Sequence, residues 1–436
     1  MTTSEFSKRR KRLMRMMGHD GIAVLPTAPV RIRNRDVEYP YRADSDFYYL
    51  TGFPEPEAVM VLAPGRKHGE YILFCRERDQ EQETWHGRRA GQEGACKIYE
   101  ADDSFPISDI DDILPGLLEN REKVFYSIGC DPDFDQKVTG WINNLRKRSR
   151  SGVHTPAEFV ALDHLLHDMR LYKSRAEISA IRKAAKISIK AHKRAMQVCR
   201  PDMTEHQIEA ELMYEFMRNG ARAPAYPPIV ASGANGCILH YTENESVMKS
   251  KDLLLIDAGA EYDSYASDIT RTFPVNGKFT RAQKDVYEIV LAAQDAAIAK
   301  VQPGNHWNDP HEAAISVITQ GLIDIGLLKG RLPTLIKKQA YKKFYMHRTG
   351  HWLGMDVHDV GDYKVGDEWR ILEPGMVMTV EPGIYIPANL DKVPRKWWDI
   401  GIRIEDDVLV TAEGNEVLTE GLPRTVADIE ALMAGR

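Results

Sequence analysis

The pattern of apolar and polar positions over the first 150 residues predicts a mixed α/β domain. An amphipathic pattern at about residues 5–17 predicts a helix, and four short apolar runs bounded by turn residues predict strands. These runs are 21–25, 47–51, 58–62 and 71–75. Helical and strand patterns then alternate, so we expect a sheet covered by helices.

A polar, highly charged stretch at residues 146–152 interrupts this periodicity. Such a charge run favours a solvated loop or helix end, and we place the domain linkage between it and Leu171. The chain has 436 residues, long enough for two domains with a core in each. We therefore predict an N-terminal domain at residues 1–170 and a second domain at residues 171–436.

The second domain begins with four helix-start signals. Three are capping boxes and the fourth is a proline in a first helical turn: Ser174 with Glu177, Thr204 with Gln207, Thr280 with Gln283, and Pro310 after Asp309. The order helix, helix, strands occurs twice, which suggests two similar halves. We predict an α+β fold in which four main helices pack on one side of a curved antiparallel sheet.

Two strands in the first half of this domain each carry an acid. The apolar run 253–256 leads into Asp257, and Asp268 lies within the predicted strand 265–273. A hairpin with its turn at 262–263 would put the two acids directly opposite each other. Like charges in that position destabilise a sheet, more so in apolar surroundings, so a cation between them is expected. The alternative is two independent surface acids, each with its own basic partner.

The second half repeats this pattern. The apolar run 376–380 leads into Glu381, and Glu405 lies within the predicted strand 400–410. Both halves of the domain therefore supply a pair of carboxylates carried on strands.

Three histidines, His347, His351 and His358, lie within the segment 346–359. Its tryptophan, leucine, methionine and valine make it too apolar for a solvated loop. A partly buried His351 needs a hydrogen-bond partner or a metal. Its two neighbouring histidines could support it or relay protons.

The four carboxylates and His351 form a candidate metal site. Oxygen-rich sites with a single histidine suit Mn²⁺ or Mg²⁺, and Zn²⁺ or Co²⁺ less exclusively. Four carboxylates carry more negative charge than one divalent ion balances. Two ions that share bridging carboxylates would balance it, and this arrangement indicates two-metal hydrolysis.

Composition excludes several other classes of function. The net charge is −6, so the chain has no general attraction to nucleic acid or to anionic membranes. Its five cysteines are scattered and never spaced as Cys-x-x-Cys, which argues against a disulfide framework and a thiolate metal site. Neither a signal peptide nor an apolar run of membrane-spanning length is visible. We expect a cytoplasmic protein with no nucleic-acid or membrane partner.

Five segments of the second domain resemble the metal-binding motifs of the Xaa-Pro aminopeptidases, also called aminopeptidase P. These segments are 256–259, 268–271, 347–359, 379–383 and 403–406. The family has the pita-bread fold, which it shares with prolidase and methionine aminopeptidase. Segments 38–53 and 235–244 resemble the bacterial form in particular, and the resemblance covers nearly the whole chain.

The resemblance implies a pair of metal ions, Mn²⁺ in the first place, with Zn²⁺ or Co²⁺ as alternatives. Asp257 and Asp268 would bind one ion, and His351 and Glu381 would complete the second. Asp268 and Glu405 would bridge the two.

Further roles follow from the same resemblance. Glu381 would accept a proton from water, and His240 and His358 would flank the substrate and stabilise the tetrahedral intermediate. The implied catalytic residues are His240, His347, His358, Glu381 and Arg403. The implied substrate-binding residues are His240, His358, Tyr226, Tyr385, Asp36 and Trp85.

The implied substrates are peptides with proline in the second position, and the implied assembly is a homo-oligomer, either a tetramer or a dimer. In the family's oligomers a tryptophan in the motif around Trp85 reaches a neighbouring subunit's active site. Two segments depart from the usual pattern. Residues 348–350 are Arg-Thr-Gly where many relatives carry Gly-Leu-Ser, and residues 226–228 are Tyr-Pro-Pro instead of Tyr-Asn-Thr. A prolidase acting only on Xaa-Pro dipeptides, and a non-catalytic binding relative, are the alternatives.

Overall fold

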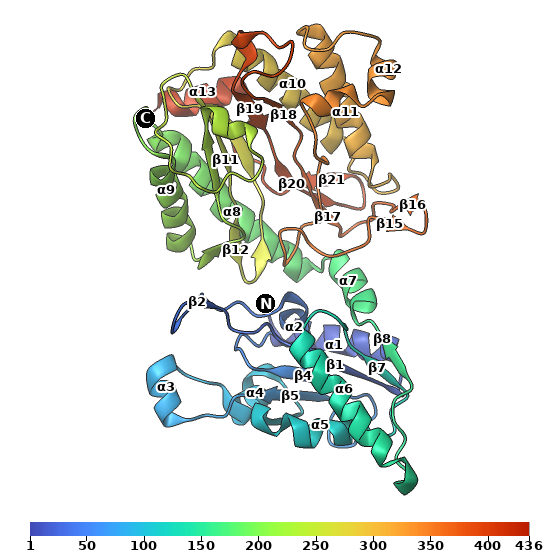
Figure 1. Cartoon of the computed structure of the whole chain (residues 1–436). Helices are drawn as coiled ribbons and strands as arrows, with labels where there is room; N and C mark the ends of the chain where they lie inside the picture. The colour runs from blue at the N-terminus through green and yellow to red at the C-terminus, as the bar shows by residue number, and fades with distance from the viewer. Residues whose placement is uncertain (436) are drawn as a thin grey trace. The chain divides into compact units, whose positions relative to one another are not determined.

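The computed structural model describes residues 1–435. The chain forms two compact units, Met1–Met169 and a second that begins at Arg170 (Figure 1). Each unit has its own strands and its own apolar core.

The first unit contains a six-stranded mixed sheet in the order β6-β5-β4-β1-β7-β8. Its strands are β1 (Gly21–Pro26), β4 (Val59–Leu62), β5 (Tyr71–Cys75), β6 (Asp103–Pro106), β7 (Lys123–Phe125) and β8 (Glu158–Val160). The central strand β1 is antiparallel to β4 and parallel to β7. The short strands β2 (Ile32–Asn34) and β3 (Val37–Glu38) form a separate hairpin. The expected mixed α/β character is confirmed.

Seven helices accompany these strands, the last ending just past the boundary between the units. They are α1 (Thr3–Met17), α2 (Ser45–Thr51), α3 (Gln80–His86), α4 (Gly91–Tyr99), α5 (Ile110–Leu118), α6 (Pro132–Lys147) and α7 (Asp163–Leu171). Helices α5 and α6 bury one face against the sheet, where Leu114 and Trp141 join Ile22 and Ile72 in one apolar cluster.

The strand predicted at 47–51 is wrong, because these residues belong to helix α2. Asp44 caps this helix by accepting a hydrogen bond from the Phe47 amide at 2.9 Å. Gly52 ends it in the left-handed conformation, with φ of 64°, which glycine adopts without steric cost. The apolar run is too short for its periodicity to distinguish a strand from a buried helix.

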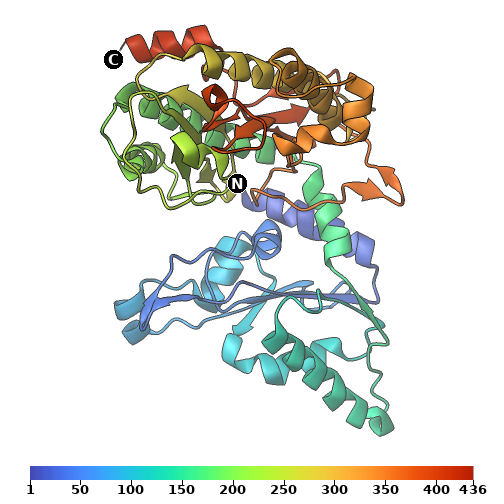
Figure 2. The same ribbon diagram turned by 45° about the horizontal axis from the view of Figure 1, so that its top comes forward.

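The second unit contains the four helices predicted from their start signals, and two more. They are α8 (Arg175–Val198), α9 (Glu205–Arg218), α10 (Arg281–Ile298), α11 (Asp309–Asp324), α12 (Leu332–Lys337) and α13 (Val426–Ala434). All three predicted capping boxes are present. Figures 1 and 2 show α8 with α9 and α10 with α11 beside the strands of this unit.

Antiparallel strands make up the rest of this unit. The first half contributes β9 (Ala223–Pro224), β10 (Ile229–Ser232), β11 (Leu253–Asp257), β12 (Ala260–Tyr262), β13 (Tyr265–Ala266) and β14 (Thr270–Pro274). The second half contributes β15 (Lys364–Val365), β16 (Glu368–Trp369), β17 (Val377–Val380), β18 (Gly383–Ile386), β19 (Ile400–Arg403), β20 (Asp406–Val410) and β21 (Asn415–Val417). The three-stranded sheets β10-β11-β14 and β17-β20-β21 are the counterparts in the two halves. The predicted α+β fold with two similar halves is confirmed.

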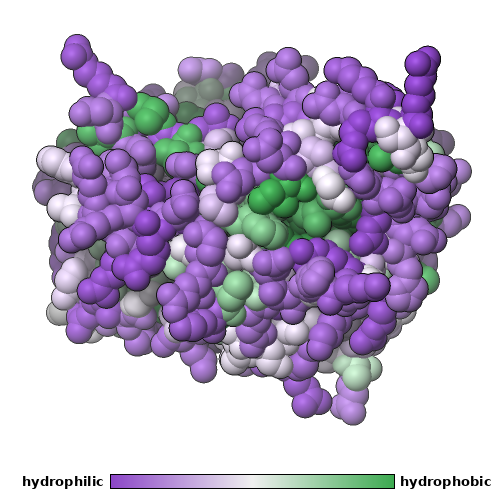
Figure 3. Space-filling model, turned by 90° about the horizontal axis from the view of Figure 1, so that it is seen from below, coloured by the Kyte–Doolittle hydropathy of each residue, from purple (hydrophilic) through white to green (hydrophobic). Residues whose placement is uncertain are grey.

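Hydrophilic residues dominate the molecular face in Figure 3, and apolar residues there are confined to small patches. Within residues 1–435, each helix is either too short or too polar to span a bilayer.

The buried carboxylate of Asp359 fixes the loop that carries His351 and His358. It accepts from Lys173 Nζ at 2.9 Å and from Arg170 at 2.5 Å, and its side chain is only 1% exposed. Burial alone would raise the pKa of Asp359, but the charges of Lys173 and Arg170 outweigh it and lower the pKa. Its amide donates to the carbonyl of Trp352 at 2.9 Å. The ionised carboxylate therefore joins the loop to the residues before α8.

Replacing Asp359 by alanine should destabilise the second unit by about 3–5 kcal/mol, because the buried Lys173 would lose its carboxylate partner and the buried Arg170 would keep only Asp356. Thermal unfolding should reveal this as a lowered transition temperature. Asp362→Ala, at an exposed position nearby, should change stability by no more than about 0.5 kcal/mol. Since the pKa of Asp359 is depressed, its contribution is present at neutral pH and is lost only as the pH falls below about 4. Equal stability of the two variants would contradict this account.

Candidate metal centre

Asp257 and Asp268 lie on the same hairpin but are not directly opposite each other. Strand β11 pairs with β14 so that Asp257 faces Thr270, and the predicted register is therefore wrong by two residues. The turn consists of Asp263 and Ser264, both with positive φ (51° and 64°), the conformation that suits a tight two-residue hairpin. Side chains alternate between the faces of a strand, so a two-residue shift leaves both acids on the same face.

The second half presents its acids in the corresponding way. Val380 of β17 pairs with Asp406 of β20, which puts Glu381 opposite Glu405 where the ladder is interrupted. The predicted strands 265–273 and 400–410 are each interrupted at their acid, so Asp268 precedes β14 and Glu405 precedes β20. Each half of the unit still offers two carboxylates from the ends of adjacent strands.

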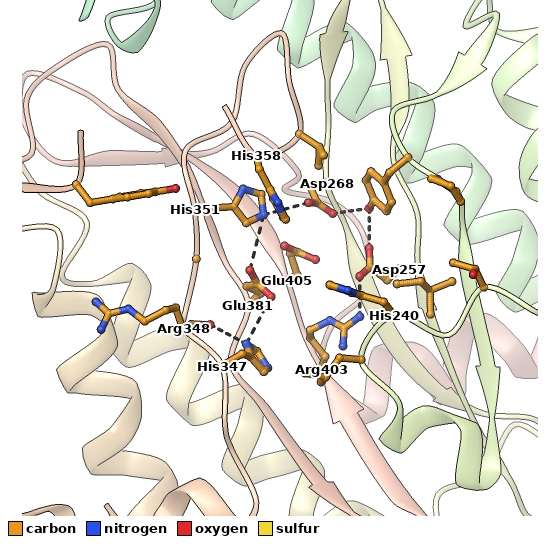
Figure 4. Close-up of a pocket in the computed structure, with 18 of the residues that line it drawn as sticks. His240, Asp257, Asp268, His347, Arg348, His351, His358, Glu381, Arg403 and Glu405 are labelled. Atoms are coloured by element: carbon orange, nitrogen blue, oxygen red, sulfur yellow. Dashed lines mark hydrogen bonds and ion pairs between the residues drawn. The ribbon is translucent and has the colours of Figure 1, made fainter. Parts of the chain in front are cut away.

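The four carboxylates and His351 converge on one point (Figure 4). His351 Nε2 lies 3.4 Å from Asp268 Oδ2 and 3.7 Å from Glu381 Oε1. Asp268, His351 and Glu405 offer ligand atoms that all lie within 4.8 Å of one another. This donor set, mostly oxygen with one imidazole nitrogen, fits divalent metal ions.

The electrostatics of the cluster also favour cations. Burial raises the pKa of Glu381 to about 7, although the charges of His351 and Arg403 partly oppose it. Burial and the neighbouring acids likewise raise the pKa of Glu405 well above its ordinary value. For His351 burial alone would lower the pKa, but the hydrogen bond to Asp268 and the charge of Glu381 raise it to about 9. His351 and Arg403 therefore neutralise only part of the negative charge of the carboxylates, and divalent ions can neutralise the rest.

Local backbone geometry fixes the direction of the His351 ring. Its Nδ1 hydrogen-bonds with the carbonyl of Trp352 at 2.9 Å, which leaves Nε2 facing the carboxylates. Its amide donates to Thr379 Oγ1 at 3.1 Å. Gly350 permits this approach, because a Cβ there would lie 2.0 Å from the Thr379 carbonyl oxygen.

Arg403 links the carboxylates to a second group of residues. It donates to Asp257 Oδ2 at 2.6 Å, to Thr270 Oγ1 at 3.1 Å and to the Tyr385 hydroxyl at 3.0 Å. The Tyr385 hydroxyl also hydrogen-bonds with His347 Nε2 at 2.9 Å. His347, Tyr385 and Arg403 thus form one connected network, which holds Asp257 in a fixed orientation.

The hydroxyl of Tyr226 lies between two of the acids. It contacts Asp257 Oδ1 at 2.6 Å and also contacts Asp268 Oδ1. Burial and the two carboxylates raise its pKa well above the ordinary value. In this arrangement Tyr226 orients the carboxylates, and its contact with substrate stays a prediction.

A pocket of about 720 Å³ surrounds the cluster. The predicted site residues that line it are Tyr226, His240, Asp257, Asp268, His347, His351, His358, Glu381, Arg403 and Glu405. The ring centroid of His358 lies 4.2 Å from that of His351. Tyr385 is fully buried and contacts the pocket residues His347 and Arg403.

Asp36 and Trp85 are not among the residues that line this pocket. Both belong to the first unit. Asp36 is exposed between β2 and β3, and Trp85 is 77% exposed on α3. Their proposed contacts with substrate stay predictions.

Several residues of the site were not identified from the sequence. Thr270 donates to Glu405 Oε2 at 2.7 Å, and Asp407 accepts from the Asp268 amide at 3.2 Å. Each lies two positions after an acid of the site, so strand alternation could have indicated it. The pocket wall also includes Trp307 and Trp369, which no spacing pattern singles out.

Comparisons with known proteins identify the family of this chain. The model of metallopeptidase family M24 matches residues 179–412, and the model of the aminopeptidase P N-terminal domain matches residues 6–126. The Xaa-Pro aminopeptidase of Escherichia coli (strain K12) is 46% identical over 434 residues, covering 99% of this chain and 98% of that protein.

Solved structures of similar proteins superpose on the whole length of this chain. An aminopeptidase of Pseudomonas aeruginosa superposes with a TM-score of 0.99 at 62% identity, covering 100% of this chain and 98% of that one. Zinc-substituted E. coli aminopeptidase P in complex with product gives a TM-score of 0.97 at 46% identity, covering 100% and 99%. The chain therefore belongs to metallopeptidase family M24 and, within it, to the Xaa-Pro aminopeptidases.

Proposed function

We propose that this protein is a metal-dependent aminopeptidase that hydrolyses the bond between an N-terminal residue and a following proline. The observation that carries the proposal is the convergence of four carboxylates and His351 in one pocket. The substrate class is supported by the full-length relatives that are named Xaa-Pro aminopeptidases.

Two divalent ions would be held by five residues: Asp257, Asp268, His351, Glu381 and Glu405. Asp268 and Glu405 are the proposed bridging ligands, since both also lie in the tight group with His351. Mn²⁺ is the proposed ion because the donors are mainly oxygen, and Zn²⁺ or Co²⁺ could occupy the same set. When bound, such ions act as Lewis acids and lower the pKa of water, so that hydroxide is available near neutral pH.

The chain's own residues handle protons and charge around that water. Glu381, whose pKa burial raises to about 7, is suited to accept a proton from the attacking water and pass it to the proline nitrogen. His240 and His358 line the pocket and would donate hydrogen bonds to the oxyanion that forms at the carbonyl. The positively charged amine of the substrate would be attracted to the carboxylates, which favours cleavage at the N-terminus of a peptide.

A prolidase would use the same five ligands, so the choice rests on substrate length. Tripeptides of the form Xaa-Pro-Xaa should be hydrolysed with added Mn²⁺, and dipeptides Xaa-Pro should be at least about tenfold poorer substrates. Release of the N-terminal amino acid, measured by chromatography with and without Mn²⁺, tests this. Cleavage of dipeptides alone would favour the prolidase, and cleavage of neither, with metal bound, would favour a non-catalytic relative.

We further propose a cytoplasmic homo-oligomer, a tetramer or a dimer. All five cysteines are free, which suits a reducing compartment. Trp85, 77% exposed on the polar helix α3, is suited to an interface or a substrate contact, since exposed tryptophans are enriched there.

Substitution of the proposed bridging ligands should abolish activity. Asp268→Ala or Glu405→Ala should lower kcat/KM by more than the 10–100-fold that residues supporting metal ligands typically cost. His351→Ala should lose bound metal as well as rate, whereas His358→Ala should lose rate and keep its metal. Metal content by mass spectrometry, measured alongside the rates, separates these cases. Metal loss in His358→Ala but not in His351→Ala would show that the ligand assignment is wrong.

Trp85→Ala should change either the assembly or the use of long peptides. We expect a lower mass in solution by light scattering, or a several-fold change in KM for long Xaa-Pro peptides relative to tripeptides. The control is Tyr39→Ala, another exposed aromatic of the first unit. Unchanged kinetics on every peptide together with an unchanged mass would leave Trp85 without a function.

A further inference from the structure

The pocket contains two guanidinium groups that differ in how they are paired. Arg403 is buried, and its carboxylate partner Asp257 lies 2.6 Å away. Arg348 also lines the pocket and is exposed to it, yet no carboxylate in residues 1–435 lies within ion-pair distance of it. The charge of Glu312 acts on Arg348, but Glu312 is linked to it only through Asn308, whose amide donates to Glu312 Oε1 at 2.6 Å. Arg348 is therefore a cation of the pocket wall that is available to a ligand.

Neutral groups hold the Arg348 side chain in place. It donates to Asn308 Oδ1 at 2.6 Å, and its guanidinium carbon lies 5.0 Å from the centroid of the Trp369 ring. An amide oxygen and an aromatic face orient a guanidinium without neutralising it. The planar group is thus ordered before any ligand arrives, which reduces the entropy that binding costs.

The position of Arg348 favours contact with the part of a peptide substrate that follows the scissile bond. It directly follows His347, whose Nδ1 lies 3.8 Å from Glu381 Oε2, and its side chain points away from the four carboxylates (Figure 4). The amine of a substrate is positively charged and would be repelled by Arg348. In a tripeptide cleaved at the carboxylate cluster, the terminal carboxylate lies two residues beyond the scissile bond, about 7 Å in an extended chain. This distance is comparable to the length of an extended arginine side chain.

We propose that Arg348 binds a carboxylate in the part of the substrate that follows proline. This carboxylate is either the C-terminus of a tripeptide or the side chain of an acidic third residue. The inference rests on the proposed peptidase function and adds a specificity-determining residue to it. Guanidinium and carboxylate form a bidentate, charge-assisted pair, so the geometry suits either source.

Three peptides with the same first two residues test the proposal in the Mn²⁺-loaded enzyme. They are Xaa-Pro-Ala as the free acid, Xaa-Pro-Ala amide, and Xaa-Pro-Glu amide. The wild type should have about tenfold higher kcat/KM on at least one of the two anionic peptides than on the neutral amide, the size expected for one solvated charge-assisted hydrogen bond. The peptide that is preferred identifies the source of the carboxylate.

Variants of Arg348 test whether this residue causes the preference for anionic peptides. Arg348→Gln should remove the preference by raising KM for the anionic peptide, while kcat/KM for the neutral amide stays within about twofold. Arg348→Lys should restore part of it. The matched control is Lys364→Gln, because the Lys364 ammonium lies 4.7 Å from the same Trp369 ring but does not line the pocket. This variant should keep the full preference.

Three results would overturn the inference: equal rates of the wild type on all three peptides, an equal loss on all three in Arg348→Gln, or the same loss of preference in Lys364→Gln. Each leaves the peptidase function intact. Hydrolysis of none of the peptides by the wild type would instead contradict the proposed function and, with it, this inference.

Discussion

Repulsion among four closely grouped carboxylates is the constraint on which the rest of the catalytic unit depends. Asp268 and Glu405 are buried and Asp257 and Glu381 are partly buried, so water screens their charges less than at the surface, and burial raises the pKa of three of them. His351 and Arg403 offset part of this charge. Protons or divalent cations can neutralise the negative charge that remains. Because the carboxylates repel one another without a cation, the same repulsion increases the affinity of the cluster for metal ions.

The fold imposes this repulsion through two equivalent antiparallel ladders. Each half carries one acid where a strand ends, Asp257 or Glu381, and another just before the partner strand begins, Asp268 or Glu405. The loop with His351 and His358 adds nitrogen donors from outside the ladders, and its position depends on the buried pairs of Asp359 with Lys173 and Arg170. The four carboxylates proposed as metal ligands thus depend on the rigidity of the strands, whereas His351 and His358 depend on buried ion pairs.

The features predicted best from the sequence are those fixed by residues close together in the chain, such as the starts of helices. Each capping box satisfies the free amides of a helix start with side chains three residues apart, so α8, α9 and α10 could be located from residue spacing alone. The hairpin register failed by two residues because it depends on the backbone conformation of Asp263 and Ser264, which residue type does not determine. The error leaves Asp257 and Asp268 on the same face of the sheet, since side chains alternate along a strand and the shift is an even number of residues. Trp307 and Trp369 reach the pocket only through tertiary packing, which spacing cannot reveal.

The central claim is that this cluster holds two metal ions and not one. The most direct measurement is a crystal structure of the protein prepared with Mn²⁺, with diffraction recorded on both sides of the manganese absorption edge. The account predicts two anomalous peaks within the group of Asp257, Asp268, His351, Glu381 and Glu405, with Asp268 and Glu405 each in contact with both. A single peak at saturating Mn²⁺, or peaks that do not touch these carboxylates, would contradict it.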